Sequence, residues 1–324
     1  MIAVIVLVLL ALLALGAYLA VSHDYSDEPP ASVAGCANPH IASDGVTRVS
    51  AHRSGGGIAP ENTLMAFKNC VEDEGFDVDL FEFDLHITSD GELVLLHDET
   101  LDRTSDAVEH FGHADVRPSE HTYAELHELN MGEGFTTDSG ETPYKGLRGD
   151  EIPDDLRIMR AQDVFSYLGS QGDFDYIIEI KDSGELGYAA CDKLYSLLQE
   201  FSLLDDAVIG TFNAEVTEYM ETNYPDMLRS ASVSEVAGFF VDMLLGRDRP
   251  EGYYRFEALQ IPLTYYDFIY LGSTRLINRA HEYDIAVQYW TINDAETVEL
   301  LSSRGADAIM TDYPDMAYDV IHGE

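Results

Sequence analysis

Acidic residues alternate with apolar ones in the run from Leu80 to Leu85, and this run is the clearest chemical signal in the chain. Side chains two residues apart in a strand point to the same face, so Glu82 and Asp84 should share one. Two neighbouring carboxylates repel each other unless a cation lies between them. Oxygen ligands suit Mg²⁺ or Ca²⁺ better than Zn²⁺. The run therefore predicts a divalent metal site, the alternative being an edge strand with solvated acids.

A histidine is expected to reach these carboxylates through a hairpin. The dipeptide Asp90-Gly91 is a strong signal for a two-residue hairpin turn. A hairpin centred there would place His97 opposite Asp84, on the face of the carboxylates. A register slip of one residue would turn His97 to the other face.

A second cluster begins with His52 and Arg53, which follow a short apolar run and precede the glycine-rich segment 54–57. Such a loop can expose backbone N–H groups to a phosphate. The guanidinium of Arg53 can donate to two phosphate oxygens at once. The alternative is a flexible turn with a capping arginine. Glu61 stands at the start of the next predicted helix, where an acidic residue is also favoured by the helix dipole.

Two further candidates lie in the second half of the chain. The segment 176–181 has the pattern of a buried strand with Glu179 and Lys181 on one face. The chain has only four Lys against 14 Arg, so a lysine in an apolar strand is unlike a surface residue. Glu179 is a candidate metal carboxylate and Lys181 a candidate phosphate contact, with a structural salt bridge as the alternative. Trp290, the only tryptophan, is either a core residue or a platform for substrate.

These motifs occur in a fixed order over residues 47–320. They are His52-Arg53, Pro60-Glu61-Asn62-Thr63, Glu82-x-Asp84, His97-Asp98, Arg103-Thr104, Glu179-x-Lys181, Trp290-Thr291-x-Asn293 and Thr311-Asp312-x-Pro314.

The ordered set resembles the glycerophosphodiester phosphodiesterase family. The resemblance implies a TIM (β/α)8 barrel, with one divalent metal (Ca²⁺ or Mg²⁺) as cofactor. It further implies roles for the candidates in three groups. The metal ligands would be Glu82, Asp84 and Glu179, the acid/base pair His52 and His97, and the substrate and phosphate contacts Arg53, Lys181, Trp290 and Glu61.

The segment at about 105–157 is predicted to be an insert in the barrel. Its part around Asn130–Asp154 looks like the insert of membrane-anchored family members, several of which act on lysophospholipids as lysophospholipase D. The chain has Ser54 where the family commonly has Gly, and Ser105 where it commonly has Thr. Neither change removes a charged or nucleophilic group, so activity should be retained.

Composition bounds the setting in which the protein works. The chain has 324 residues, enough for one barrel of about 250 residues, and a net charge of −42. Repulsion between so many negative charges is tolerated where dissolved salt screens it. The net charge therefore indicates a halophilic organism, and among halophiles an archaeon. No basic stripe exists to neutralise phosphates, so nucleic acid is excluded as a partner.

The N-terminus is an uninterrupted apolar run over residues 2–21, and about 20 such residues span a bilayer. No Lys or Arg precedes the run, so the positive charges that usually indicate the orientation of a transmembrane helix are missing. We expect residues 1–22 to be an uncleaved transmembrane anchor in the cell membrane, on a side that the sequence does not give. A cleaved signal segment, and hence a secreted protein, is the alternative. An acidic, Pro-containing linker at 23–46 leads into the barrel at 47–324.

Helical patterns recur at 62–74, 158–169, 185–202, 213–223, 274–283 and 294–304. Strand patterns occur at 48–52, 80–87, 92–97, 175–181, 206–211, 227–232, 257–262, 285–291 and 307–311. These are nine candidates for eight barrel positions. Residues 80–97 are too short to contain a βαβ crossover, so one candidate does not belong to the wall or the barrel is irregular there.

Three functions are compatible with these observations. The first is metal-dependent hydrolysis of a glycerophosphodiester to glycerol phosphate and an alcohol. The attacking group would be water or the neighbouring glycerol hydroxyl. Attack by the hydroxyl would pass through a cyclic phosphate. The second is lysophospholipase D, with the anchor near lipid and the insert shaping an acyl groove. The third, from another class, is a non-catalytic receptor for phosphate or lipid, which would have lost a histidine or a metal carboxylate. This chain has lost none of them.

Overall fold

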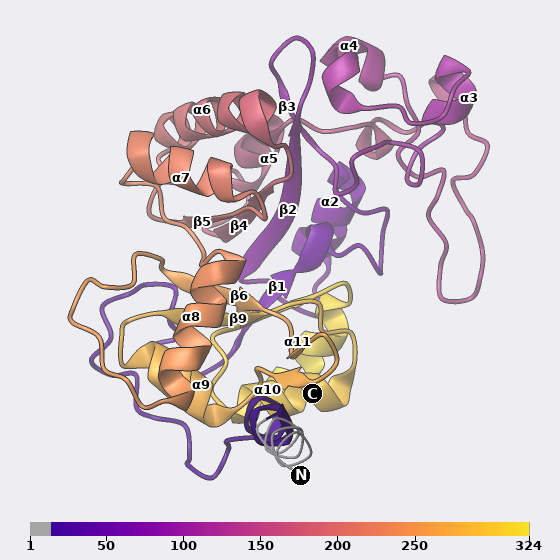
Figure 1. Cartoon of the computed structure of the whole chain (residues 1–324). Helices are drawn as coiled ribbons and strands as arrows, with labels where there is room; N and C mark the ends of the chain where they lie inside the picture. Colours follow the sequence, from indigo (N-terminus) through magenta and orange to yellow (C-terminus); the bar gives the residue numbers. More distant parts are fainter. Residues whose placement is uncertain (1–13, 324) are drawn as a thin grey trace, which may run out of the picture.

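A nearly closed barrel of parallel strands forms the centre of the molecule (Figure 1). The computed structural model describes residues 14–323. The strands follow one another around the wall in the order β5-β4-β2-β1-β10-β9-β6. They are β1 (Arg48–Ala51), β2 (Leu80–Ile87), β4 (Asp175–Ile180), β5 (Ala207–Gly210), β6 (Ala258–Ile261), β9 (Ala286–Tyr289) and β10 (Ala308–Thr311).

The eighth position of the wall lies between β5 and β6 and has no regular strand. Two isolated parallel bridges cross it, Ile209 with Arg229 and Ser230 with Ala258. The predicted strand at 227–232 therefore lies in the wall but pairs only at these points. The barrel prediction is confirmed in this form, with seven regular parallel strands in the described chain.

The extra strand candidate is β3 (Leu93–Leu95), which pairs with β2 as an antiparallel hairpin outside the barrel path. Leu85 pairs with Leu95, so the predicted register is wrong by one residue. The N–H of Thr88 donates to the carbonyl of Glu92, and Gly91 adopts a left-handed φ of 81°. The connection is therefore a longer loop that ends in a left-handed glycine, and not the two-residue turn. His97 lies beyond the end of β3, where strand alternation no longer determines its direction.

Helices cover the outside of the barrel. The predicted ones are α2 (Leu64–Glu72), α5 (Ala161–Leu168), α6 (Gly184–Phe201), α7 (Ala214–Asn223), α9 (Thr274–His281) and α10 (Ala295–Ser303). Two more, α8 (Val233–Leu244) and α11 (Pro314–His322), were not predicted. Aromatic side chains on the outer face of β2, such as Phe81 and Phe83, pack against this layer and form the main core.

The insert forms a separate lobe of short elements on one side of the barrel (Figure 1). Its elements are α3 (Ala107–Phe111), α4 (Tyr123–Leu126) and the 3-10 turns Pro118–Glu120, Gly149–Glu151 and Asp154–Leu156. A small hairpin follows β6, made of β7 (Thr264–Tyr265) and β8 (Ile269–Tyr270).

Most of the predicted transmembrane segment at 2–21 lies outside the described residues. Over residues 14–323, no helix combines the length and apolar character needed to cross a membrane. A helix is described over residues 14–22, and the acidic segment after it lies against the barrel. Asp24 accepts from Arg304 at 2.6 Å, and Asn38 donates to the carbonyls of Glu257 and Asp284, both at 2.8 Å. These two carbonyls lie one residue before β6 and two residues before β9, so residues 36–42 cover the N-terminal end of the barrel.

Candidate active site

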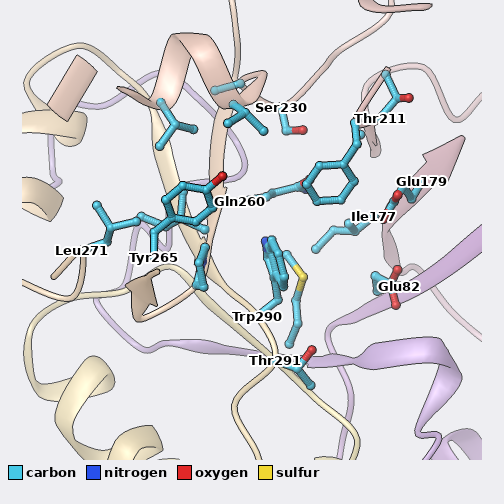
Figure 2. A pocket seen from close by; sticks show the side chains of 18 of the residues that line it. Glu82, Ile177, Glu179, Thr211, Ser230, Gln260, Tyr265, Leu271, Trp290 and Thr291 are labelled. Carbon is cyan, nitrogen blue, oxygen red and sulfur yellow. The ribbon is translucent and has the colours of Figure 1, made fainter. Parts of the chain in front are cut away.

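A cavity of about 400 Å³ lies at the C-terminal ends of the strands, the end of such barrels that carries active sites. Eight of the nine predicted site residues line it, and Glu61 is the exception. Figure 2 shows Glu82, Glu179 and Trp290 around this space. The eight are His52, Arg53, Glu82, Asp84, His97, Glu179, Lys181 and Trp290.

The carboxylates face the inside of the barrel from two neighbouring strands. Asp84 on β2 pairs in register with Glu179 on β4, and Glu82 lies two residues before Asp84 on the same face. Glu82 and Asp84 are 5% and 1% exposed. Burial, together with the charge of Asp84, raises the pKa of Glu82 to about 8. The group therefore holds more negative charge than its surroundings neutralise.

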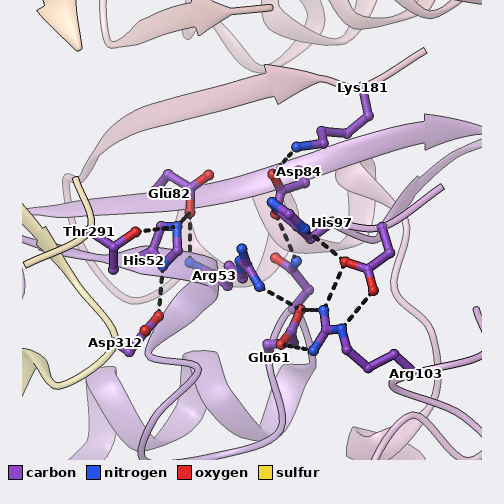
Figure 3. Close-up of polar contacts among 12 residues, drawn as sticks. His52, Arg53, Glu61, Glu82, Asp84, His97, Arg103, Lys181, Thr291 and Asp312 are labelled. Carbon is purple, nitrogen blue, oxygen red and sulfur yellow. Dashed lines mark hydrogen bonds and ion pairs between the residues drawn. The ribbon is translucent and has the colours of Figure 1, made fainter. Parts of the chain in front are cut away.

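Lys181 partly neutralises this charge. Its Nζ lies 2.9 Å from Glu179 Oε1 and 3.6 Å from Asp84 Oδ1. Burial raises the pKa of Glu179, and the ammonium group of Lys181 opposes that rise. Figure 3 shows Lys181, which directly follows β4, with its ammonium group beside Asp84.

The metal prediction fits the chemistry of these donors but not their present arrangement. Over residues 14–323, no three His, Cys, Asp or Glu side chains are grouped so that they could hold a metal ion. The ammonium of Lys181 lies in contact distance of two of the proposed ligands. The donor set consists of carboxylates alone, which are the ligands that Mg²⁺ and Ca²⁺ prefer, and the charge of Asp84 contributes to the raised pKa of Glu82.

His52 is held on both sides of its ring. Its Nδ1 lies 2.6 Å from Asp312 Oδ1, and its Nε2 lies 3.4 Å from Thr291 Oγ1 and 3.9 Å from Glu82 Oε2 (Figure 3). Burial alone would lower the pKa of His52, but the charge of Glu82 and the hydrogen bond to Asp312 outweigh burial and raise it. Asn293 fixes the carboxylate by donating to Asp312 Oδ2 at 2.6 Å.

His97 belongs to a chain of charged hydrogen bonds that ends at Arg53. The Nδ1 of His97 lies 2.9 Å from Asp98, and Arg103 donates to Asp98 at 2.6 Å. Arg103 also donates twice to Glu61, at 2.7 and 2.8 Å, and Arg53 donates to Glu61 at 3.3 Å. Glu61 does not line the cavity but lies between Arg53 and Arg103, where it orients Arg53 (Figure 3).

The glycine-rich loop does not form the predicted phosphate cradle. The N–H groups of Gly55 and Gly56 donate to the carbonyl of His52, and that of Gly57 donates to Asp312. None of these residues lines the cavity, since the loop is used to join β1 to the end of β10. Ser54 adopts a left-handed φ of 65°, a backbone conformation that favours glycine.

Comparison with known proteins assigns the family. The model of the glycerophosphoryl diester phosphodiesterase family matches residues 52–316. The chain belongs to this family. It is therefore an enzyme of the phosphodiesterase class.

Three individual likenesses illustrate the range of this phosphodiesterase's relatives. A glycerophosphodiester phosphodiesterase of Caldanaerobacter subterraneus is 27% identical over 85% of the chain and 98% of its own length. A human lysophospholipase D is 24% identical over 82% of each chain. The solved structure of an Oleispira antarctica phosphodiesterase with the product sn-glycerol-3-phosphate has the same fold. It has a TM-score of 0.62 and 20% identity, and the match covers 87% of this chain and 99% of that one.

Two expectations about the phosphodiesterase's site need revision. Asp98, Arg103 and Asp312 hold the two histidines and occur in the sequence motifs, but they are not among the predicted site residues. Asp312 directly follows β10, whereas Asp98 and Arg103 lie three and eight residues beyond the end of β3. The insert at 105–157 contributes no residue to the cavity lining. The apolar wall that it was expected to supply comes from α8 and the β7–β8 hairpin, because these follow the strands at the open end of the barrel.

Proposed function

We propose that the protein hydrolyses glycerophosphodiesters, releasing glycerol phosphate and an alcohol. One observation carries the proposal: two histidines, two cationic side chains and three carboxylates converge in one cavity. The family assignment supports it independently. In the reaction an oxygen nucleophile forms a bond to phosphorus, the P–O bond to the leaving alcohol breaks, and one proton moves on each side.

The two histidines supply these proton transfers. One imidazole takes the proton of the attacking hydroxyl, and the other gives a proton to the leaving alkoxide. His52 is kept in position by Asp312 and His97 by Asp98. Arg53 and Lys181 stabilise negative charge on the non-bridging phosphoryl oxygens.

Glu82, Asp84 and Glu179 would hold one divalent cation of the Mg²⁺ or Ca²⁺ type. Such an ion, when bound, supplies Lewis-acid stabilisation of charge on the phosphoryl oxygens. The ammonium of Lys181, which contacts Glu179 and Asp84, would compete with such an ion for these carboxylates. We expect Glu82→Gln to weaken the binding of Ca²⁺, measured by titration calorimetry, by about tenfold or more.

The first experiment is hydrolysis of glycerophosphocholine in molar KCl, with and without EDTA. We expect EDTA-sensitive release of glycerol phosphate. We also expect a loss of kcat of roughly 10²–10⁴-fold in His52→Ala and in His97→Ala. His113→Ala, which changes an exposed histidine of the insert, is the control for folding and should keep its rate. Near-normal kcat in either site variant would refute the assignment of that histidine.

Lysophospholipase D is the second candidate function, and the apolar half of the cavity favours it. Beyond the charged residues the lining is made of side chains such as Ile177, Phe212, Val236, Phe240 and Leu271. A water-soluble glycerophosphodiester leaves such a surface unfilled. Choline release from lysophosphatidylcholine, faster than glycerol phosphate release from glycerophosphocholine, would identify this activity. Hydrolysis of the soluble diester alone would exclude it.

A further inference from the structure

An apolar stripe of α8 forms one wall of the cavity and continues to its mouth. Val233, Val236, Ala237, Phe240 and Val241 all line the cavity, and their spacing puts them on one side of the helix. Val233 and Val241, at the two ends of the stripe, are 47% and 46% exposed, whereas Phe240 between them is buried, so the stripe reaches solvent as well as the cavity. A helix that is apolar where it meets water marks a surface with a function.

Aromatic side chains continue this surface on the other side of the mouth. Phe212 follows β5 and lies edge-on to Trp290, at 6.1 Å between ring centroids. Tyr265, Tyr266 and Phe268 come from the β7–β8 hairpin, and Tyr265 lines the cavity (Figure 2). Tyr266 is 72% exposed and Phe212 is 62% exposed.

The described N-terminal helix joins the same surface. Val21 lines the cavity, and Tyr18 stacks on Phe268 at 6.0 Å between ring centroids. Leu15, Tyr18 and Leu19 are each at least half exposed. In sequence, the residues that precede this helix are all apolar from Ile2 to Leu13. The chain's most apolar stretch therefore enters the described structure beside the mouth of the cavity.

We use the name apolar rim for the exposed members of these three groups. Most of the large apolar side chains that are exposed over residues 14–323 belong to it. Those outside it are Val46, Val108, Leu186, Leu245 and Tyr253, of which Val108 lies on the insert and Leu186 on α6. The apolar rim consists of Leu15, Tyr18, Leu19, Phe212, Val233, Val241, Tyr265, Tyr266 and Phe268.

We propose that the apolar rim lies on a lipid bilayer and that the apolar half of the cavity receives the acyl chain of a lysophospholipid from it. The inference rests on the phosphodiesterase function proposed above and adds the source and class of the substrate. In this position the acyl chain passes from lipid to the wall of α8 without crossing water. The phosphodiester then reaches Arg53 and Lys181 on the opposite side of Trp290.

Charge favours apolar contact over electrostatic attraction as the basis of docking. The protein carries a net charge of −42, and Asp267 stands between Tyr266 and Phe268 in the hairpin. A strongly anionic membrane would therefore repel this face. Insertion of aromatic and aliphatic side chains into a zwitterionic interface needs no such attraction.

The acyl site can be tested without turnover, because Trp290 is the only tryptophan and lies in the cavity wall. The probe is lysophosphatidylcholine brominated on its acyl chain, kept below its micelle-forming concentration and added to the His97→Ala variant. We expect quenching of Trp290 fluorescence by this lipid, and no quenching by its unbrominated form. Absence of quenching, in a protein whose parent hydrolyses glycerophosphocholine, would overturn the acyl site and leave the phosphodiesterase function standing.

The docking face is tested by the double variant Tyr266→Ser, Phe268→Ser. Its substrates are lysophosphatidylcholine in phosphatidylcholine vesicles and glycerophosphocholine in solution. We expect kcat/KM to fall by about tenfold on vesicles and to change by less than about twofold in solution. The matched control is Val108→Ser, Leu186→Ser, which removes two exposed apolar side chains elsewhere and should leave both values unchanged.

An equal fall on both substrates, or no fall on vesicles, would overturn the docking proposal. Activity on the soluble diester reports folding of each variant in the same assay. If the parent enzyme hydrolyses neither substrate, the proposed function fails, and that outcome is distinct from failure of the docking face.

Discussion

The site is organised at the scale of single residues by pairing each histidine with an aspartate. His52 contacts Asp312, and His97 contacts Asp98. Each aspartate is held in turn by another side chain, Asn293 or Arg103. Such partners select the tautomer and the orientation of an imidazole. Asp312 acts through His52, and so we regard it as a positioning residue.

At this scale we predict that Asp312→Asn lowers kcat by roughly 10²-fold, because the imidazole of His52 loses its orienting acceptor. The substitution also removes a contribution that raises the pKa of His52. The limb of the pH–rate profile that reports His52 should therefore move to lower pH. Steady-state kinetics from pH 5 to 9 would measure both effects.

Asp315→Asn is the matched control, since Asp315 is exposed and does not line the cavity. It removes the same charge three residues away and should leave the profile unchanged. A profile that moves equally in both variants would show that net charge, and not the contact with His52, sets that limb.

At the scale of elements, the carboxyl ends of the barrel strands bring the site together. β1, β2, β4, β9 and β10 supply the charged and hydrogen-bonding groups, while the segment from β5 to β8 supplies the apolar half. The weakest part of the wall is the eighth position, which has two isolated bridges. Arg229 joins it to the surrounding helices: its side chain is 4% exposed and contacts Glu221 on α7 and Glu235 on α8.

We predict that Arg229→Met lowers the free energy of unfolding by about 2 kcal/mol, because it leaves Glu235 without its charged partner. Arg255→Met, an exposed arginine nearby, should change it by less than about 0.5 kcal/mol. Urea titration in molar KCl, followed by near-UV circular dichroism, would measure both. Equal stability of the two variants would mean that the bridges alone hold the eighth position.

At the scale of the whole molecule, negative charge dominates. With 60 acidic and 18 basic residues, the folded chain repels itself over long distances. Screening shortens the range of that repulsion from about 10 Å at 0.1 M salt to about 3 Å at 1 M. We infer that the protein works in high salt.

The corresponding prediction is a rise of at least about 5 °C in Tm when KCl is increased from 0.1 M to 2 M, since screening relieves the repulsion that destabilises the compact state. Differential scanning calorimetry would measure it. Sucrose at matched osmolality does not screen charge and serves as the control. A flat Tm in KCl, or an equal rise in sucrose, would contradict a role for self-repulsion.

The sequence by itself determined the features that depend on neighbouring residues. Strand alternation put Glu82 and Asp84 on one face, the order of motifs indicated the family, and the strand patterns located the barrel wall. Only the tertiary structure decided the features that depend on closure of the barrel. Closure pairs His52 with Asp312 and brings His97 to the cavity from beyond its strand. It also makes α8, and not the insert, the apolar wall. These contacts join segments far apart in the chain, and local periodicity contains no information about which strand ends will meet.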